Sequence, residues 1–272
     1  MAGRRRAAGA GLVALLALSG GAPAGSAPAA AVRVVQITAD EITVDATTGD
    51  GAASGRVRVT DGQTTATADR ARLARREGQV VLTGAARVVA PQGALAAREI
   101  TVTFTRQAIT RLVARGQASL EAEEMRLQAP GITIVPAREE VAADGGVALA
   151  VPPDVTARGQ RFAYQRVGGQ MLLDGDVRVV TRDGVLEGTR LDGDRRLRRL
   201  QMQGPVRATY GEILVHSQAA AVDGQERVAV FTGQVRATQP GRWLTTDRLT
   251  VWYAQRRMRA DGPTRIHVDP QP

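Results

Sequence analysis

Eight glycines recur at nearly even intervals along the chain and constrain its fold more than any other feature. Successive glycines are separated by 29, 32, 29, 30, 29, 29 and 29 residues, and they are Gly55, Gly84, Gly116, Gly145, Gly175, Gly204, Gly233 and Gly262. A period of this length indicates a repeat architecture, in which each unit buries its apolar face against its neighbours. We therefore predict one structural unit that is copied about eight times, and we call these residues the repeat glycines.

The residues that follow each repeat glycine alternate between apolar and polar, as in Gly55-Arg56-Val57-Arg58-Val59. This alternation is the pattern of a half-buried β-strand. A second marker precedes each glycine, with a small residue, then usually a polar one, any residue and usually an apolar one, as in Ala39-Asp40-Glu41-Ile42. The marker lies 16 residues before its glycine in six copies, 19 in the third and 23 in the fourth, where we place it at Ala122-Glu123-Glu124-Met125. Each copy is thus predicted to hold two strands.

Glycine inside a strand often marks a bulge or a kink. A kink at the same point of every copy predicts a sheet that is bent along a line, as a folded sheet or a flattened roll. Pro152 and Pro153 cannot both lie in a central strand, so a loop is expected there. The expected organisation is a leader at residues 1–31, repeats one to four at 32–150, repeats five to eight at 151–268 and a tail at 269–272. Two separate halves and one continuous structure both remain possible.

The N-terminal segment has the layout of a secretory signal peptide. Arg4-Arg5-Arg6 precedes an apolar stretch of 12 residues from Ala7 to Leu18, and Ala-x-Ala sites follow within residues 27–31. This stretch is short for a bilayer span, which needs about 20 residues. We therefore expect a cleaved leader and an exported chain, with an uncleaved N-terminal anchor as the alternative.

Little in the sequence indicates catalysis or metal binding. The chain has no cysteine, so it has neither disulfides nor a thiol nucleophile, and its two histidines, His216 and His267, lie far apart within strand patterns. We see no nucleophile elbow and no phosphate-binding loop. Asp40, Asp69 and Asp247 recur at the marker position, which would suit a β-helix carbohydrate enzyme, but their place beside a strand start favours a structural role. We therefore expect no enzymatic activity, no cofactor and no metal.

The phased repeats resemble the OstA-like family of lipopolysaccharide transport proteins, which includes LptA-type periplasmic proteins. The resemblance covers about residues 34–268 and is carried by Ile37-Thr38-Ala39-Asp40, the strand that begins at Gly55, and Ala66-Thr67-Ala68-Asp69. It implies an all-β protein, a twisted antiparallel β-jellyroll of about sixteen strands that is open along one side like a taco.

The resemblance also implies a function. It suggests a non-enzymatic carrier in the periplasm that holds the acyl chains of lipopolysaccharide, or of a related glycolipid, in an apolar groove. Copies would associate head to tail through their edge strands, or with other proteins of the same transport system. Nothing indicates a nucleic-acid partner. Two alternatives stay open, namely a structural solenoid with a dry core and the β-helix enzyme.

Two sets of residues are candidates for the site. The inward positions predicted to line the groove are Ile42, Val44, Val57, Val59, Ile100, Val102, Met125, Phe162, Val177, Val179, Leu191, Val206, Val235 and Leu249. All basic residues are arginine, the net charge is +9, and the third position after the glycine is arginine in six copies: Arg58, Arg87, Arg178, Arg207, Arg236 and Arg265. These six are candidates for phosphate contact, with pairing to acidic neighbours or simple solvation as the alternative.

Overall fold

The computed structural model describes residues 35–61, 63–105, 109–122, 125–194 and 196–269. The predicted leader at residues 1–31 lies outside this range. In the part of the chain that the structure describes, no helix is long and apolar enough to cross a membrane.

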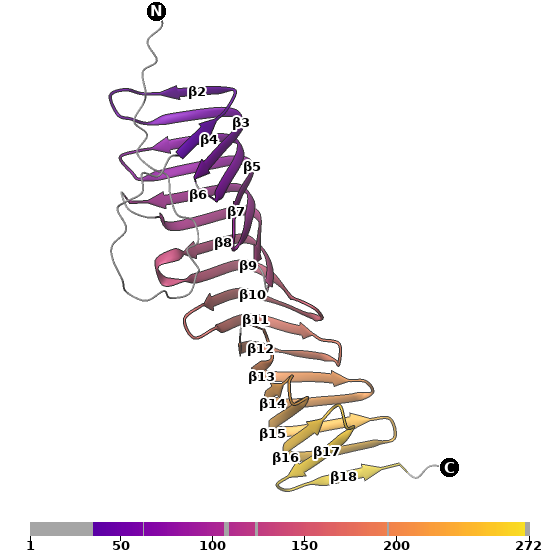
Figure 1. The fold of residues 1–272 in the computed structure, drawn as a ribbon. Coiled ribbons are helices and arrows are strands. Elements are labelled where there is room, and N and C mark those ends of the chain that lie inside the picture. The colour runs from indigo at the N-terminus through magenta and orange to yellow at the C-terminus, as the bar shows by residue number, and fades with distance from the viewer. Residues whose placement is uncertain (1–34, 62, 106–108, 123–124, 195, 270–272) are drawn as a thin grey trace, which may run out of the picture. The chain divides into compact units, whose positions relative to one another are not determined.

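The described chain consists of eighteen β-strands and one short 3-10 helix (Figure 1). The elements of the first half are β1 (Val35–Thr38), β2 (Glu41–Val44), β3 (Gly51–Asp61), β4 (Thr64–Ala74), β5 (Gln79–Ala90), β6 (Gly93–Phe104), β7 (Ile109–Ala122), β8 (Met125–Val135) and the helix η1 (Pro136–Arg138). Those of the second half are β9 (Glu140–Val151), β10 (Val155–Gln165), β11 (Gln170–Val180), β12 (Val185–Asp194), β13 (Arg199–Tyr210), β14 (Ile213–Asp223), β15 (Val228–Gln239), β16 (Arg242–Trp252), β17 (Arg257–Asp261) and β18 (Arg265–Val268).

The strands form an antiparallel meander in which successive strands pair with each other. At the two ends, β1 and β2 both pair with β3, and β17 and β18 both pair with β16. The eighteen strands therefore occupy sixteen positions in the sheet. This confirms the all-β, antiparallel prediction and its number of strands.

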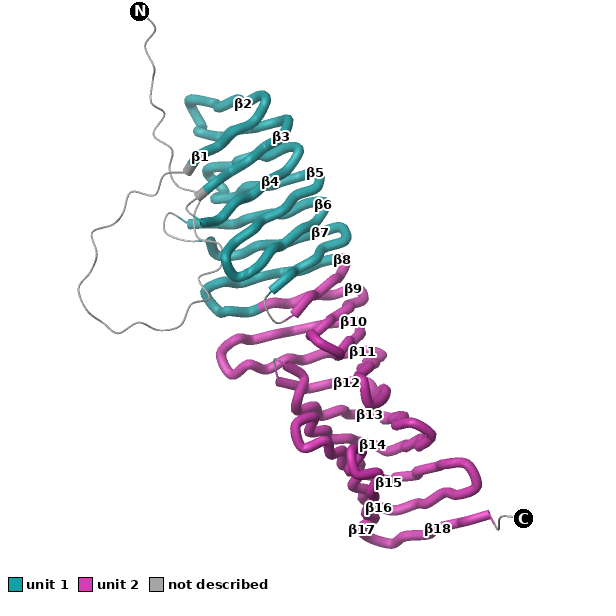
Figure 2. The backbone as a smooth tube through the Cα atoms, turned by 45° about the vertical axis from the view of Figure 1, so that its right-hand side comes forward, with its two compact units in different colours: residues 1–123, 131–140 teal, residues 124–130, 141–272 magenta. Residues whose placement is uncertain are grey.

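The chain divides into two compact units (Figure 2). Unit 1 comprises residues 1–123 and 131–140, and unit 2 comprises residues 124–130 and 141–272. Each unit contains its own run of bent strand pairs and its own buried apolar residues, and each is described by itself below.

Six of the repeat glycines lie at β-bulges, as their place inside strands predicts, and Gly262 lies between β17 and β18. Along β3 and β4 the register passes from Ser54 opposite Arg70 to Val57 opposite Ala68, so β3 carries one extra residue. Gly55 has φ +73° and the next residue, Arg56, has φ +49°, so both adopt the left-handed conformation. The residue after the glycine has a φ between +44° and +55° in five copies, at Arg56, Ala85, Gln117, Asp176 and Gln234. The bulges bend the strands of each unit.

The two sequence markers are in phase because they touch. A Cβ atom on Gly175 would lie 2.8 Å from the Cβ of Gln160, the second residue of the preceding marker. The same relation holds between Gly84 and Asp69 and between the other glycines and their markers. Only a residue without a side chain leaves room for this crossing.

This contact corrects the assignment of the fourth marker. Gly145 lies over Pro130, where its Cβ would be 3.2 Å from the proline Cγ, so the marker of this copy is Ala129-Pro130-Gly131-Ile132. Its spacing to the glycine is then 16 residues, as in six other copies. Our placement at Ala122 was wrong, because β7 extends to that residue and ends there.

Candidate functional site

Inward-facing residues of successive strands line up into continuous apolar rows. In unit 2 one row runs through seven neighbouring strands as Phe162, Leu173, Leu191, Met202, Ala220, Phe231 and Leu249. None of these side chains is more than 4% exposed. Such a row offers an unbroken apolar surface along the direction in which the strands stack.

The structure buries most of the residues predicted to line a groove. Twelve of the fourteen are between 0% and 7% exposed: Val57, Val59, Ile100, Val102, Met125, Phe162, Val177, Val179, Leu191, Val206, Val235 and Leu249. The other two, Ile42 and Val44, are 49% and 68% exposed because β2 is an end strand with no further neighbour. The interior of each unit is therefore filled by its own side chains, and a lipid chain would have to displace contacts to enter.

Small marker residues leave the space that the large interior residues fill. Gly188 lies opposite Val177, and a Cβ on Gly188 would be 2.5 Å from the Cγ of Met202. Gly159 has the same relation to Leu173, whose Cγ would be 2.8 Å away. The alternation of small and large residues thus packs the interior closely, which Ala and Val alone would not do.

The turns between strands form two margins of the sheet. In unit 2 the first margin consists of the turns β11–β12, β13–β14 and β15–β16, and the second consists of the turns β12–β13, β14–β15 and β16–β17. Along the second margin, the Gly224 amide donates to the Arg198 carbonyl at 2.6 Å and the Tyr253 amide to the Arg227 carbonyl at 3.2 Å. Backbone bonds therefore link the successive turns of this margin.

The two margins of unit 2 meet along a line that we call the seam. Arg227 of the second margin pairs with Asp183 of the first, with Nη2 and Oδ1 2.9 Å apart. Tyr210 of the first margin stacks on Tyr253 of the second, with ring centroids 5.6 Å apart and planes 12° from parallel. The edge of Tyr210 also faces the interior Phe231, at 6.2 Å between centroids. The folded sheet is therefore closed over its apolar rows at these points.

The two tyrosine rings of the seam are shielded from water to different degrees. Burial raises the pKa of the Tyr210 hydroxyl well above its usual value and also raises the pKa of Tyr253. Both phenols therefore stay protonated at neutral pH. Stacking of two such rings contributes about 0.5–1.5 kcal/mol beyond the area that it buries.

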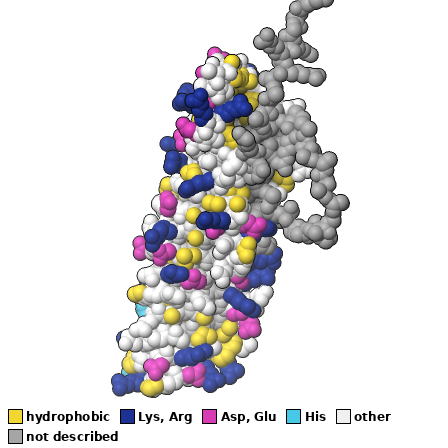
Figure 3. Space-filling view, turned by 90° about the vertical axis from the view of Figure 1, so that its left-hand side faces the viewer, with side chains coloured by type: hydrophobic (Ala, Val, Ile, Leu, Met, Phe, Trp, Pro, Cys, Tyr) yellow, Lys and Arg dark blue, Asp and Glu magenta, His cyan; other side chains and the backbone are white. Residues whose placement is uncertain are grey.

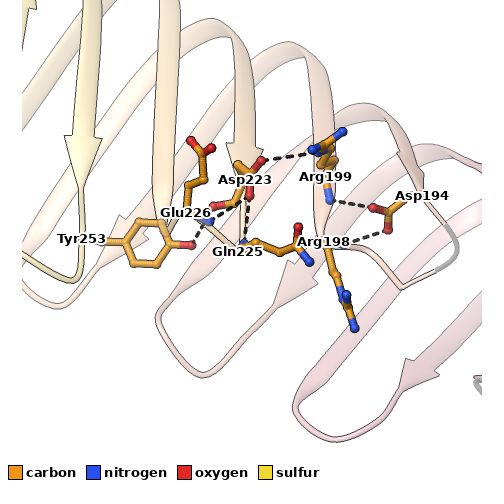
Figure 4. Close-up of polar contacts among 7 residues, drawn as sticks. All are labelled: Asp194, Arg198, Arg199, Asp223, Gln225, Glu226 and Tyr253. Atoms are coloured by element: carbon orange, nitrogen blue, oxygen red, sulfur yellow. Dashed lines mark hydrogen bonds and ion pairs between the residues drawn. The ribbon is translucent and has the colours of Figure 1, made fainter.

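A polar network holds the second margin beside the seam (Figure 4). Asp223 accepts bonds from the amides of Gln225 and Glu226 at 2.9 and 3.0 Å, and it forms an ion pair with Arg199. The Glu226 amide is the largest cause of a lowered pKa at Asp223. Asp194 likewise accepts from the amides of Arg198 and Arg199. Carboxylates at successive turns thus tie down backbone donors that would otherwise face water.

Comparison with known proteins identifies the family to which this folded sheet belongs. A family model described as the LptA/(LptD N-terminal domain) LPS transport protein matches residues 36–198 and 214–271. The chain belongs to this family. Among solved structures, LptH, the LptA homologous periplasmic component of the lipopolysaccharide transport device of Pseudomonas aeruginosa, is 16% identical, with a TM-score of 0.21, and the match covers 63% of this chain and 82% of that one. At these values the likeness decides neither fold nor function. Comparison with curated protein sequences found no match.

This member of the LPS transport family also carries the predicted arginine row on its outer face. In unit 2 the cross-strand order is Arg158, Arg178, Glu187, Arg207, His216, Arg236, Thr245 and Arg265. In unit 1, Thr67 lies between Arg58 and Arg87. Figure 3 shows arginine side chains spaced along the visible face, with acidic side chains among them.

The acidic partners expected for this row are mostly missing. Of the six predicted arginines, Arg178 forms an ion pair with Glu187, and no other one pairs with a carboxylate among the described residues. Arg236 instead lies over the Trp243 ring, 5.6 Å from its centroid. Most of the row therefore faces solvent.

The aromatic residues near the C-terminus do not form one cluster. Trp243 begins β16 and stacks on His267, with centroids 5.6 Å apart, whereas Trp252 ends β16 and lies under Arg257. Tyr253 belongs to the seam. Sequence reasoning missed the seam, although a usable signal existed: the chain contains only three tyrosines, and two of them meet there.

The described residues contain no group of three or more His, Asp or Glu side chains that could hold a metal ion. The recurring aspartates Asp40, Asp69 and Asp247 each pack over a repeat glycine. Asp40 also forms an ion pair with Arg56 at 2.6 Å. This placement fits the structural role predicted for them.

Proposed function

We propose that this chain is a periplasmic carrier that holds the acyl chains of lipopolysaccharide, or of a closely related glycolipid, between the two sides of its folded sheet. Membership of the LPS transport family supports the cargo, and the continuous apolar row from Phe162 to Leu249 supports the binding mode. The signal-like segment at residues 4–31 supports export. Burying each methylene of an acyl chain would contribute about 0.8 kcal/mol.

Loading requires the seam to open. The interior side chains already contact one another, so acyl chains must replace these contacts, and in unit 2 the margins are joined by Asp183–Arg227 and Tyr210–Tyr253. A solvent-accessible ion pair contributes about 0–1 kcal/mol and the ring stack a similar amount. These are weak enough for the apolar surface of a lipid chain to displace. We therefore assign the seam as the entry side of the groove.

The decisive experiment is site-specific photo-cross-linking in the full chain expressed in a host that makes lipopolysaccharide. A benzoylphenylalanine in place of the inward Leu191 should become attached to lipopolysaccharide after irradiation. The same probe in place of the outward Val89, which is 40% exposed, should not. Equal labelling at both positions, or none at Leu191 in a folded protein, would contradict the carrier proposal.

A second candidate function is a structural solenoid with a dry core, because the interior side chains are almost fully buried. It predicts that the protein is purified from cells without bound lipid. Native mass spectrometry of the gently purified protein separates the two candidates. Copurified glycolipid that is released on denaturation supports the carrier, and a lipid-free mass that persists after lipopolysaccharide is added supports the solenoid.

The carrier proposal includes assembly by strand addition. The end strands of the described chain expose large apolar side chains that elsewhere would be covered, namely Ile37, Ile42 and Val44 in unit 1 and Ile266 and Val268 in unit 2. An end strand also presents unpaired backbone groups to a neighbour. We propose that these ends pair with another copy or with other proteins of the transport system. Arginines of the outer row would then contact lipid phosphates.

A further inference from the structure

The outer face of unit 2 contains a depression of about 340 Å³. Its lining includes two outward positions from each of four strands, β8 to β11: Arg126 and Gln128, Ala148 and Ala150, Thr156 and Arg158, and Arg178 and Val180. All of these residues belong to unit 2. The inward residues Leu149 and Ala157 also border it, but none of the fourteen residues predicted to line the groove does.

The depression exists because one copy departs from the repeat. Ala148 is the third residue after Gly145, the position that arginine occupies in six of the eight copies. Ala150, the next outward residue of β9, is also small. The surface therefore falls away at β9, between the longer side chains of β8 and β10, and guanidinium groups border the hollow.

The charges around the depression are unbalanced. Arg158 lies directly opposite Arg178 in the β10–β11 pair, and this is the one place where two arginines face each other in the strand registers that are described. Like charges in this position are destabilising. Arg178 is paired with Glu187, but Arg158 has no ion-pair partner among the described residues. Arg126 lines the same hollow.

We propose that this depression binds an organic phosphate whose body is about the size of one hexose. Arginine binds phosphate oxygens through two parallel hydrogen bonds, and both Arg158, which has no ion-pair partner among the described residues, and Arg178 line the hollow. The hollow could hold about ten water molecules by volume, which is more than an inorganic anion needs. Val180, Ala150 and the Thr156 side chain offer an apolar surface with one hydroxyl, suited to a sugar ring.

This site extends the carrier proposal without depending on it, because it uses none of the groove residues. A sugar phosphate could reach it as the headgroup of a lipid or as a soluble metabolite. The chemistry is the same in both cases.

Isothermal titration of the full chain with glucosamine 1-phosphate tests the site. We expect saturable binding that is weaker for inorganic phosphate and absent for unphosphorylated glucosamine. Arg158→Gln should weaken binding by at least about ten-fold, the loss typical of one hydrogen bond to a charged group. Ala148→Leu fills the hollow without changing the net charge and should weaken binding to a similar degree.

The matched control is Arg58→Gln, which removes one arginine of the outer row in unit 1 and should leave binding unchanged. Equal losses for Arg58→Gln and Arg158→Gln would overturn the site, because they would indicate only attraction to a basic protein. Unchanged binding in Ala148→Leu, with far-ultraviolet circular dichroism showing the native fold, would also overturn it.

Competition identifies the source of the ligand. If lipopolysaccharide stripped of its acyl chains displaces glucosamine 1-phosphate, the site receives a lipid headgroup, and if it does not, the site receives a soluble sugar phosphate. The variant Leu191→Arg keeps this test apart from the carrier proposal. It should abolish acyl-chain capture and leave the titration with glucosamine 1-phosphate unchanged.

Discussion

At the scale of single residues, the bend of each copy depends on two adjacent positions with positive φ. Gly84 has φ +78° and Ala85 has φ +44°, and the side chain of Asp69 lies over the glycine where a Cβ would be. An L-residue at Gly84 would therefore meet both an unfavourable backbone conformation and a steric clash. The glycines recur in the sequence because this close contact with the marker residue recurs in every copy.

Substitution of this glycine should therefore be costly. We expect Gly84→Ala to lower the free energy of unfolding by about 1–3 kcal/mol. The matched control is Gly211→Ala, because Gly211 has φ +57° but a Cβ at this position would have no atom within 4 Å. Urea denaturation of both variants measures the difference. Equal losses would show that backbone strain alone, without the contact to Asp69, sets the cost.

The ion pair at the first bulge makes a second residue-scale prediction. Hydrogen bonds from Arg56 hold the pKa of the Asp40 carboxyl below its usual value. Because the pKa is lowered in the folded state, the stabilisation is fully present above the usual carboxyl pKa of about 4 and is lost as the pH falls through the lowered value. Carboxyl NMR titration should show this low pKa in the native protein and its return towards normal in Arg56→Gln. A pKa that does not move would contradict the pairing.

At the scale of elements, the seam depends on turns that no sequence pattern brings together. Asp183 and Arg227 are 44 residues apart, and they meet because the sheet folds over itself. The sequence predicts that the sheet bends, since the glycines mark the bulges. The contact between its margins also depends on the twist of the strands and on how far one margin is shifted along the other. The alternation of apolar and polar side chains does not encode either quantity.

A reversible cross-link across the seam tests its role in loading. The chain has no native cysteine, so Asp183→Cys with Arg227→Cys can be joined by a short thiol-specific linker that reductant releases. We expect the joined form to lose most labelling of lipopolysaccharide at position 191, and reduction to restore it. The control pair, Arg198→Cys with Gly224→Cys, joins two turns of the same margin without replacing a seam residue and should load normally. Full labelling of the joined form would show that cargo does not enter between these margins.

At the scale of the whole molecule, the sequence predicts the sixteen strand positions but not the state of the interior. The periods of the glycines and of the markers are enough to predict the number of strand positions. The fourth marker was misplaced because residues 122–125 carry a similar pattern. Composition could not decide between a groove and a core, because both need the same apolar residues. In the structure Met202 and Phe231 are fully buried beside small marker residues, so the interior of unit 2 is filled by its own side chains.

The exposed end strands should govern self-association. We expect Ile266→Lys with Val268→Lys to abolish concentration-dependent oligomers, because inward-pointing charges on an end strand block strand addition. These two residues are 67% and 63% exposed, and the control Val167→Lys changes a valine that is 70% exposed in the β10–β11 turn. Sedimentation velocity over a range of concentrations measures the outcome. Oligomers that survive the double substitution would place the contact elsewhere.

The offset of the seam has a mechanical consequence for unit 2. Asp183 in the β11–β12 turn meets Arg227 in the β14–β15 turn, and Tyr210 at the end of β13, beside the β13–β14 turn, meets Tyr253 in the β16–β17 turn. Each contact thus joins turns three strands apart, a climb of about 14 Å. The line of contacts between the two margins of unit 2 therefore runs obliquely to the strands. Breaking one of these contacts therefore frees two turns of unit 2 that lie at different levels of the strand stack.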